Sequence, residues 1–299
     1  MTDTITTIGP HLLGRLRPDV LDARDVRMET VFAFDAASPP HYTLDATMQQ
    51  AVDNGWVRHW PDAYRFVHWL RAQPHTPPLP PAPPGPMPPG PAPLTSVVWG
   101  DPQQLDQGQT GRCVAYAWTH LLDSDDFTHT QDGLFGGFAI ALYGAIKRRE
   151  GDPTGDPAGQ AGAYVGTGAK ELQARGRIKT YVAARTTAEI TQWILTMGPV
   201  IVGTSWHDGM FHPDASGLII PTGPVVGGHA YIIDGVDTAA DMYYGQNSWG
   251  DGWGVKGHFR IAISDFAALL ADNGDAYSTT EIPLATLRTY QGGPFAVTR

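Results

Sequence analysis

Residues 106–118 read DQGQTGRCVAYAW and contain Cys113, the single cysteine in a chain of 299 residues. A loop rich in glycine and glutamine leads directly into an apolar segment, Val114 to Leu122, whose spacing predicts a helix that begins beside the cysteine. A helix N-terminus stabilises negative charge, and the thiolate is the nucleophilic form of cysteine. Most lone cysteines are buried and inert. The position of Cys113 alone therefore does not decide between a catalytic nucleophile and an inert core residue.

A second passage, GGHAYIIDGVD at residues 227–237, places His229 at the start of a predicted apolar strand. A nucleophilic cysteine needs a base, and His229 differs from the other histidines of the chain, most of which lie in loops or polar stretches. The two glycines before it leave room for a backbone or a substrate to approach closely. The alternative is that His229 merely ends a strand. This passage alone does not decide between that structural role and the role of a catalytic base.

A third passage, QNSWGDGWGVKGHFRI at residues 246–261, contains Asn247. An amide oxygen accepts a hydrogen bond from an imidazole N–H and can hold the orientation of the ring. Trp249, two residues later, would exclude water from such a contact. A glycine-rich turn with two structural tryptophans is the alternative.

Together the three passages resemble the papain-like cysteine peptidases (the peptidase C1 family), in the order Cys, His, Asn. The resemblance implies that Cys113 is the nucleophile, that His229 acts as base and acid, and that Asn247 orients the imidazole. Gln107 would supply the side-chain half of an oxyanion hole, and the Cys113 N–H would supply the other half. Trp249 would shield the contact between His229 and Asn247 from water. Such an enzyme hydrolyses peptide bonds of a polypeptide substrate through a thioester and needs no cofactor or metal.

The resemblance covers about residues 94–281 and implies an α+β fold. A helical half carrying the cysteine packs on an antiparallel, barrel-like β half, with the active-site cleft between them. The order of predicted elements agrees, because helices come first and strands second. Helices are expected at 114–122, 138–150, 170–175 and from a capping box at Thr186 and Glu189 to Met197, with a loop at 151–168. Strands are expected at 200–204, 218–220, 229–236, 242–246 and 258–263.

A proline-rich run divides the chain, since twelve of the 20 residues from Pro74 to Pro93 are proline. We expect residues 74–93 to be an extended linker between an N-terminal segment, residues 1–73, and a catalytic domain, residues 94–299. Docking of a proline-binding module is the alternative. Within the N-terminal segment, Asp45 to Ala72 predicts one or two helices. Residues 14–25 resemble the segment that precedes the catalytic part in prokaryotic and bacteriophage members, and part of this region would pack on the catalytic domain.

The sequence departs from the family at residues 110–114, where TGRCV replaces the usual Cys-Gly-Ser-Cys-Trp. The missing cysteine removes a disulfide from the helical half, so another contact is expected to hold this loop. Arg112 would either stabilise a thiolate or point to solvent. Gly166, Gly168 and Trp206 are further candidates to line the cleft.

Composition limits the remaining classes of function. The net charge of −10 argues against nucleic-acid binding, and no apolar run is long enough to span a membrane. The first ten residues lack the pattern of a signal peptide, so a bacterial cytoplasm or a virion is expected. Residues 1–93 could contact a virion or assembly partner. The alternative functions are a structural or binding module that retains the fold, and a hydrolase or transferase of cell-wall peptides.

Overall fold

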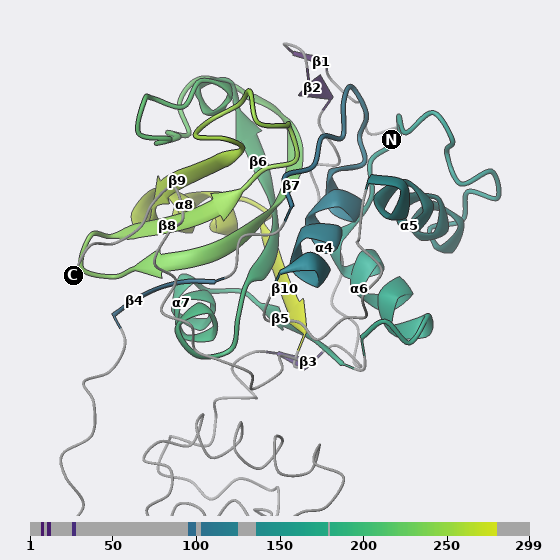
Figure 1. Ribbon diagram of the computed structural model, residues 1–299, viewed down its shortest axis with the longest axis horizontal. Helices are drawn as coiled ribbons and strands as arrows, with labels where there is room; N and C mark the ends of the chain where they lie inside the picture. Colours follow the sequence, from purple (N-terminus) through teal and green to yellow (C-terminus); the bar gives the residue numbers. More distant parts are fainter. Residues whose placement is uncertain are drawn as a thin grey trace, which may run out of the picture.

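The computed structural model describes residues 7–8, 11–12, 26–27, 95–99, 103–124, 136–178 and 180–279. The helices predicted between Asp45 and Ala72 and the proline-rich run lie outside these residues. The described part combines five α-helices with a mainly antiparallel sheet, which confirms the predicted α+β class (Figure 1).

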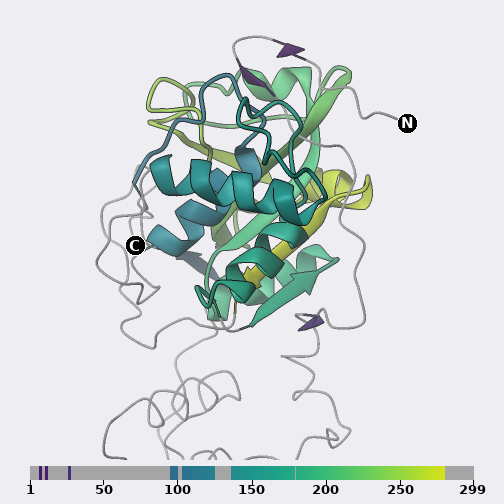
Figure 2. The same ribbon diagram turned by 90° about the vertical axis from the view of Figure 1, so that its right-hand side faces the viewer.

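Three helices gather on one face of the sheet (Figures 1 and 2). They are α4 (Cys113–Asp123), α5 (Gly136–Arg149) and α6 (Val165–Ala174). Every residue of α4 except the last is buried, because α5 and α6 cover it on one side and the sheet covers it on the other. A helix that is apolar on all faces is stable only in such a central place. The prediction of a buried apolar helix beginning at the cysteine is confirmed.

The sheet has eight strands in the described part, in the order β3-β5-β10-β6-β7-β8-β9, with β4 paired to β7. Their bounds are β3 Val26–Arg27, β4 Ser96–Val98, β5 Tyr181–Ala184, β6 Val200–His207, β7 Val225–Asp237, β8 Met242–Gln246, β9 His258–Ala262 and β10 Asp275–Thr279. All pairs are antiparallel except β3 with β5. The central strand β7 is buried along almost its whole length.

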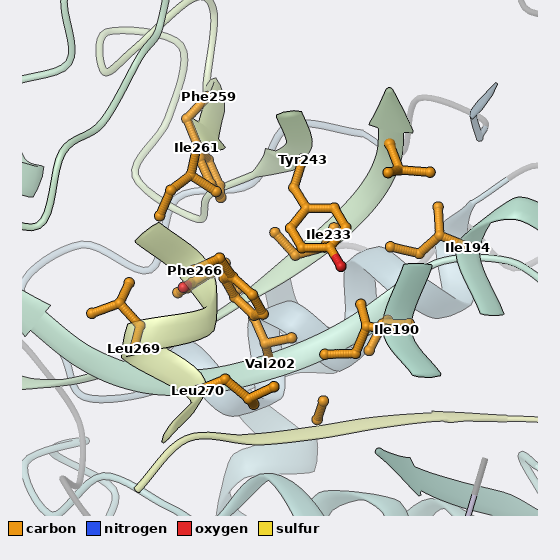
Figure 3. Packing of buried hydrophobic residues seen from close by; sticks show 14 of the residues in the cluster. Ile190, Ile194, Val202, Ile233, Tyr243, Phe259, Ile261, Phe266, Leu269 and Leu270 are labelled. Atoms are coloured by element: carbon orange, nitrogen blue, oxygen red, sulfur yellow. The ribbon is translucent and has the colours of Figure 1, made fainter. Parts of the chain in front are cut away.

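A second hydrophobic core lies on the other face of the sheet, where α7 (Thr187–Thr196) and α8 (Ile263–Ala271) pack. Figure 3 shows side chains from both helices meeting the strands. The labelled residues are Ile190 and Ile194 of α7, Phe266, Leu269 and Leu270 of α8, and Val202, Ile233, Tyr243, Phe259 and Ile261 of the strands. The sheet is therefore covered by helices on both faces, which fixes the strands that carry the candidate site.

The start of α7 follows the predicted capping box. Thr186 Oγ1 accepts from the Glu189 N–H at 3.2 Å, and Glu189 Oε2 accepts from the Thr186 N–H at 2.9 Å. These bonds satisfy two of the N–H groups that a helix start leaves without an internal partner.

One predicted loop is too long, and one predicted strand does not form. Helix α6 begins at Val165, so the last four residues of the predicted 151–168 loop are helical. Gly168 is needed there because a Cβ would lie 2.5 Å from Trp118 Nε1, and packing on that indole outweighs the low helix propensity of glycine. Leu218 forms only an isolated bridge with Arg260, so residues 218–220 are not a strand.

The segments on either side of the predicted linker join the same sheet. Val26 and Arg27 of β3 pair in parallel with Val182 and Ala183 of β5. The β4 strand pairs antiparallel with the end of β7. A short hairpin, β1 (Thr7–Ile8) with β2 (His11–Leu12), lies further upstream in the sequence.

Candidate active site

Cys113 is the first residue of α4, as predicted, and its side chain is 1% exposed. Arg112 occupies the N-cap, and its carbonyl accepts from the N–H groups of Ala115 and Tyr116 at 3.0 and 3.2 Å. The cysteine belongs to the same hydrophobic cluster as Ala230 of β7. Helix α4 also packs against β7, the strand that carries the candidate histidine.

His229 lies on β7 opposite Thr204 of β6, and it is 2% exposed. Its Nε2 is 2.8 Å from Oδ1 of Asn247, which is fully buried directly after β8. The backbone N–H of Ser248 also donates to this Oδ1, at 2.8 Å. Because a backbone N–H can only donate, the Asn247 atom facing His229 is the oxygen. A neutral imidazole that satisfies this bond carries its proton on Nε2, which makes Nδ1 the basic nitrogen.

Two tryptophans enclose the imidazole. The His229 ring stacks on Trp249 with a centroid distance of 4.6 Å and an interplanar angle of 28°. Trp206 meets it edge-on at 4.9 Å and 75°. Trp206 is fully buried and supports His229 from the core. Gly166 and Gly168 are buried within α6. That these three residues line the cleft stays a prediction.

The side-chain amide of Gln107 is held at both ends. Its Oε1 accepts from Ser248 Oγ at 2.6 Å, and its Nε2 donates to the Thr110 carbonyl at 2.5 Å. The Thr110 hydroxyl in turn donates to the Gln107 carbonyl at 2.7 Å. An amide nitrogen carries two N–H groups, and these contacts fix the plane in which both lie. Sequence reasoning found Gln107 but missed Ser248 and Thr110, although both stand beside a predicted site residue.

Arg112 contacts the loop between α5 and α6, so its side chain does not simply point to solvent, whereas its help in stabilising a thiolate stays a prediction. Its Nη2 donates to the Pro157 carbonyl at 2.7 Å, and its Cζ lies 5.8 Å from the ring centroid of Tyr143. A Cβ at Gly159 would lie 2.7 Å from Arg112 Nε, so glycine makes room for the guanidinium. The Gly111 N–H donates to the Gly159 carbonyl at 2.7 Å. These contacts join the two loops where the family disulfide is missing.

Asp156 organises the loop that Arg112 contacts. Its Oδ2 accepts at 2.7 Å from the Tyr143 hydroxyl and from the N–H groups of Gln160 and Ala161. Burial raises the pKa of Asp156, but hydrogen bonds from Tyr143 and three backbone N–H groups outweigh it, so the pKa lies below its ordinary value. The pKa of Tyr143 is raised by burial and by the bond to Asp156, with a further contribution from the charge of Cys113.

Two other kinds of site were sought in the part of the chain that the structure describes. No group of three or more His, Cys, Asp or Glu side chains there is arranged to hold a metal ion. Within the same residues, no helix is both long and apolar enough to cross a bilayer.

Comparison with known proteins defines the class. A family model of the papain family cysteine proteases matches residues 103–273, which is more than half of the 299-residue chain. The chain therefore belongs to the papain family of cysteine proteases. Its fold is similar to the crystal structure of xylellain, a cysteine protease from Xylella fastidiosa, with a TM-score of 0.54. That similarity covers 92% of this chain and 99% of xylellain at 16% sequence identity, so it shows the fold alone.

Cathepsin B-like cysteine proteinase 5 of Caenorhabditis elegans is 32% identical to this chain over 83 residues. The match covers 27% of this chain and 24% of that protein, so it spans about a quarter of the curated relative. Family membership comes from the family model, and the chemistry has to be argued from the residues of the site.

Proposed function

We propose that this protein is a cysteine peptidase in which Cys113 is the nucleophile and His229 the base and acid. One observation carries the proposal: His229 Nε2 lies 2.8 Å from Asn247 Oδ1 in a buried setting, on the strand against which the cysteine-bearing helix α4 packs. The bond directs the basic Nδ1 away from Asn247 and holds the ring in one orientation. A base oriented by a third group is the arrangement that activates a cysteine or serine nucleophile.

In the proposed reaction, His229 Nδ1 takes the thiol proton and the Cys113 thiolate attacks the carbonyl carbon of a peptide bond. The carbonyl oxygen becomes an oxyanion, which accepts hydrogen bonds from the Cys113 backbone N–H and from Gln107 Nε2. The C–N bond then breaks as His229 gives its proton to the leaving amine, and a thioester remains. Water, deprotonated by His229, hydrolyses the thioester and restores the thiol.

The amide of Gln107 suits this task. Thr110 directs one N–H of Nε2 inward to its own carbonyl, and the planar amide then directs the other N–H along a fixed line. A donor fixed in advance stabilises developing charge without reorganisation at the moment of reaction. Trp249, stacked on His229, keeps water from the bond between His229 and Asn247.

The thiol and the imidazole are expected to titrate as a pair, with a bell-shaped dependence of activity on pH whose limits belong to both groups. The substrate class is polypeptide. Docking by residues 1–93, a virion partner and the place of the protein in the cell stay predictions that no finding tests.

The test compares the parent with Cys113→Ala on casein and on a peptide library. The parent is expected to cleave peptides, and the variant is expected to fold and to be inactive. A thiol-directed epoxide should add one label to the parent and none to the variant, because the chain has one cysteine. Cleavage by Cys113→Ala at the parent rate, or a parent that neither cleaves nor labels, would overturn the proposal.

A further inference from the structure

A polar side chain outside the predicted set, Gln104, touches the backbone of Asn247. Gln104 lies on the segment that precedes α4. This segment runs beside the segment that follows β8. Asp106 and Trp249 form a bridge between the two, and the Gly250 N–H donates to the Leu105 carbonyl at 3.1 Å. The two segments therefore form one unit that carries both Gln107 and Asn247.

The amide of Gln104 makes three hydrogen bonds at this junction. Its Nε2 donates at 2.8 Å to the carbonyl of Asn247 and at 2.8 Å to the carbonyl of Leu105. Its Oε1 accepts from Gln246 Nε2 at 2.9 Å. Gln246 is fully buried, so its amide provides a fixed partner. Both N–H groups and the carbonyl of Gln104 are thus used, which leaves this side chain a single orientation.

The backbone opposite leaves space for this amide. Gly257 has φ +85°, a conformation that favours glycine, and a Cβ at this residue would overlap the Gln104 amide. The Gly257 carbonyl accepts from the Asn247 N–H at 2.9 Å. Asn247 is consequently held through its N–H by Gly257 and through its carbonyl by Gln104.

We propose that Gln104 is a positioning residue: it fixes the backbone of Asn247 and with it the direction in which Oδ1 faces His229. The inference rests on the proposed function and adds a residue to it. The direction of the Asn247 side chain depends on its backbone as well as on the contacts of Oδ1. A turn of the peptide at its carbonyl would move Oδ1 relative to Nε2, and a displacement of about 1 Å can cost on the order of 10²-fold in rate.

The experiment compares Gln104→Met with Gln103→Met. Methionine keeps the length of glutamine and removes all three hydrogen bonds. Gln103 is the neighbouring glutamine and is exposed, and its backbone N–H donates to Asp123 Oδ2 at 3.0 Å. We expect Gln104→Met to lower kcat about tenfold with little change in KM, and Gln103→Met to match the parent.

A pH profile separates positioning from general loss of structure. A well-placed Asn247 oxygen favours the imidazolium form of His229, so a displaced oxygen lets that cation lose its proton at lower pH. The alkaline limit of kcat/KM should therefore move to lower pH in Gln104→Met. Gln104→Asn, which keeps an amide of shorter reach, should show a smaller shift in the same direction. This variant replaces Gln104→Met in the experiment if Gln104→Met does not fold.

The outcomes distinguish the two levels of the argument. Folded Gln104 variants with the kcat and alkaline limit of Gln103→Met would overturn the inference and leave the peptidase assignment intact. A loss of kcat with an unmoved alkaline limit would also overturn it, since a structural role is then sufficient. A parent protein without thiol labelling or turnover would instead overturn the proposed function.

Discussion

Gln107 and Ser248 are joined by two hydrogen bonds, one between their backbones at 2.9 Å and one from Ser248 Oγ to Gln107 Oε1 at 2.6 Å. Ser248 directly follows Asn247 in the sequence. The residue proposed to hold the oxyanion is therefore tied to the residue proposed to orient the histidine. A small shift on one side of the site is transmitted to the other through these bonds.

Removal of the Gln107 side chain and removal of the Ser248 hydroxyl should both lower turnover, but by different amounts. Gln107→Ala deletes the donor, and we expect a loss of about 10²-fold in kcat, the usual effect of one oxyanion contact. Ser248→Ala leaves the Gln107 N–H donor in place but removes the hydrogen bond to Gln107 Oε1. We expect a loss of about tenfold in kcat, equivalent to one ordinary hydrogen bond. Steady-state kinetics on a peptide substrate measures both.

Alkylation by iodoacetamide provides the control for these variants, because that reaction develops no oxyanion. Its rate at Cys113 should stay close to the parent rate in Gln107→Ala. A fall as large as the fall in turnover would show that Gln107 acts on the thiol and not on the oxyanion.

His229→Ala should change the pH dependence of thiol labelling. With the imidazole present, we expect rapid labelling at pH values where an unassisted thiol is protonated. Without it, the rate should rise only as pH approaches the ordinary cysteine pKa of about 8.5. His212→Ala, a histidine directly after the short helix η2 (Asp208–Phe211), serves as the matched control. Equal profiles for the parent and His229→Ala would mean that no ion pair activates Cys113.

Arg112→Ala should destabilise the helical half. The variant loses the bond to the Pro157 carbonyl and the contact with the Tyr143 ring, together worth about 1–2 kcal/mol in the free energy of unfolding. Arg112→Lys should recover part of this loss, since an ammonium can donate to the same carbonyl. Arg177→Ala removes a comparable contact, with Cζ 5.7 Å from the Phe138 ring centroid, but touches no residue of the site.

Urea denaturation and the rate of Cys113 labelling test the arginine prediction together. Arg112→Ala should lower both, and Arg177→Ala should change only the free energy of unfolding. Equal behaviour of the two alanine variants would show that the contacts of Arg112 do not support the nucleophile.

Asp156→Asn should destabilise the protein in a pH-dependent manner. The folded state lowers the pKa of Asp156, so the ionised carboxylate stabilises the fold at pH values above its unfolded pKa. This stabilisation is lost as pH falls through the lower folded-state pKa. The difference in unfolding free energy between parent and Asp156→Asn should therefore be largest near pH 7 and should shrink below about pH 4.

Chemical denaturation at several pH values measures that difference, with Asp251→Asn, at an exposed turn, as the control. A difference that is constant from pH 7 to pH 3 would mean that the hydrogen bonds of the side chain, and not its charge, stabilise the loop.

Sequence patterns predicted the elements whose signals are local. The apolar spacing of α4, the capping box of α7 and the strand expected at residues 242–246 each rest on about a dozen residues or fewer, and the structure confirms all three. The elements missed depend on distant partners. Strand β10 is the polar stretch Asp275–Thr279 and is buried only because β5 and β6 pair on either side of it. Helix α8 begins at Ile263, the last residue of the predicted strand 258–263, and no helix is predicted from the sequence at residues 264–271.

The candidate site shows the same division. Cys113, His229, Asn247 and Gln107 could be proposed because each stands in a distinctive short passage. Two of their supporting contacts cross more than 100 residues of sequence, the bonds from Gln104 to Asn247 and from Ser248 to Gln107, and no periodicity reports such a pairing. The loss of the family disulfide was visible in the sequence, but its replacement by an arginine contact was not.

Strands β3 and β4 belong to one sheet, so residues 28–95 connect two strands of the same sheet. The entropy cost of closing a loop grows only with the logarithm of its length, by about 0.6 kcal/mol for each doubling. An insertion at this place can therefore be lengthened, shortened or exchanged with little effect on the stability of the sheet. The proline-rich run lies in that connecting stretch of the sequence, so its length and composition can change between relatives while the sheet stays the same.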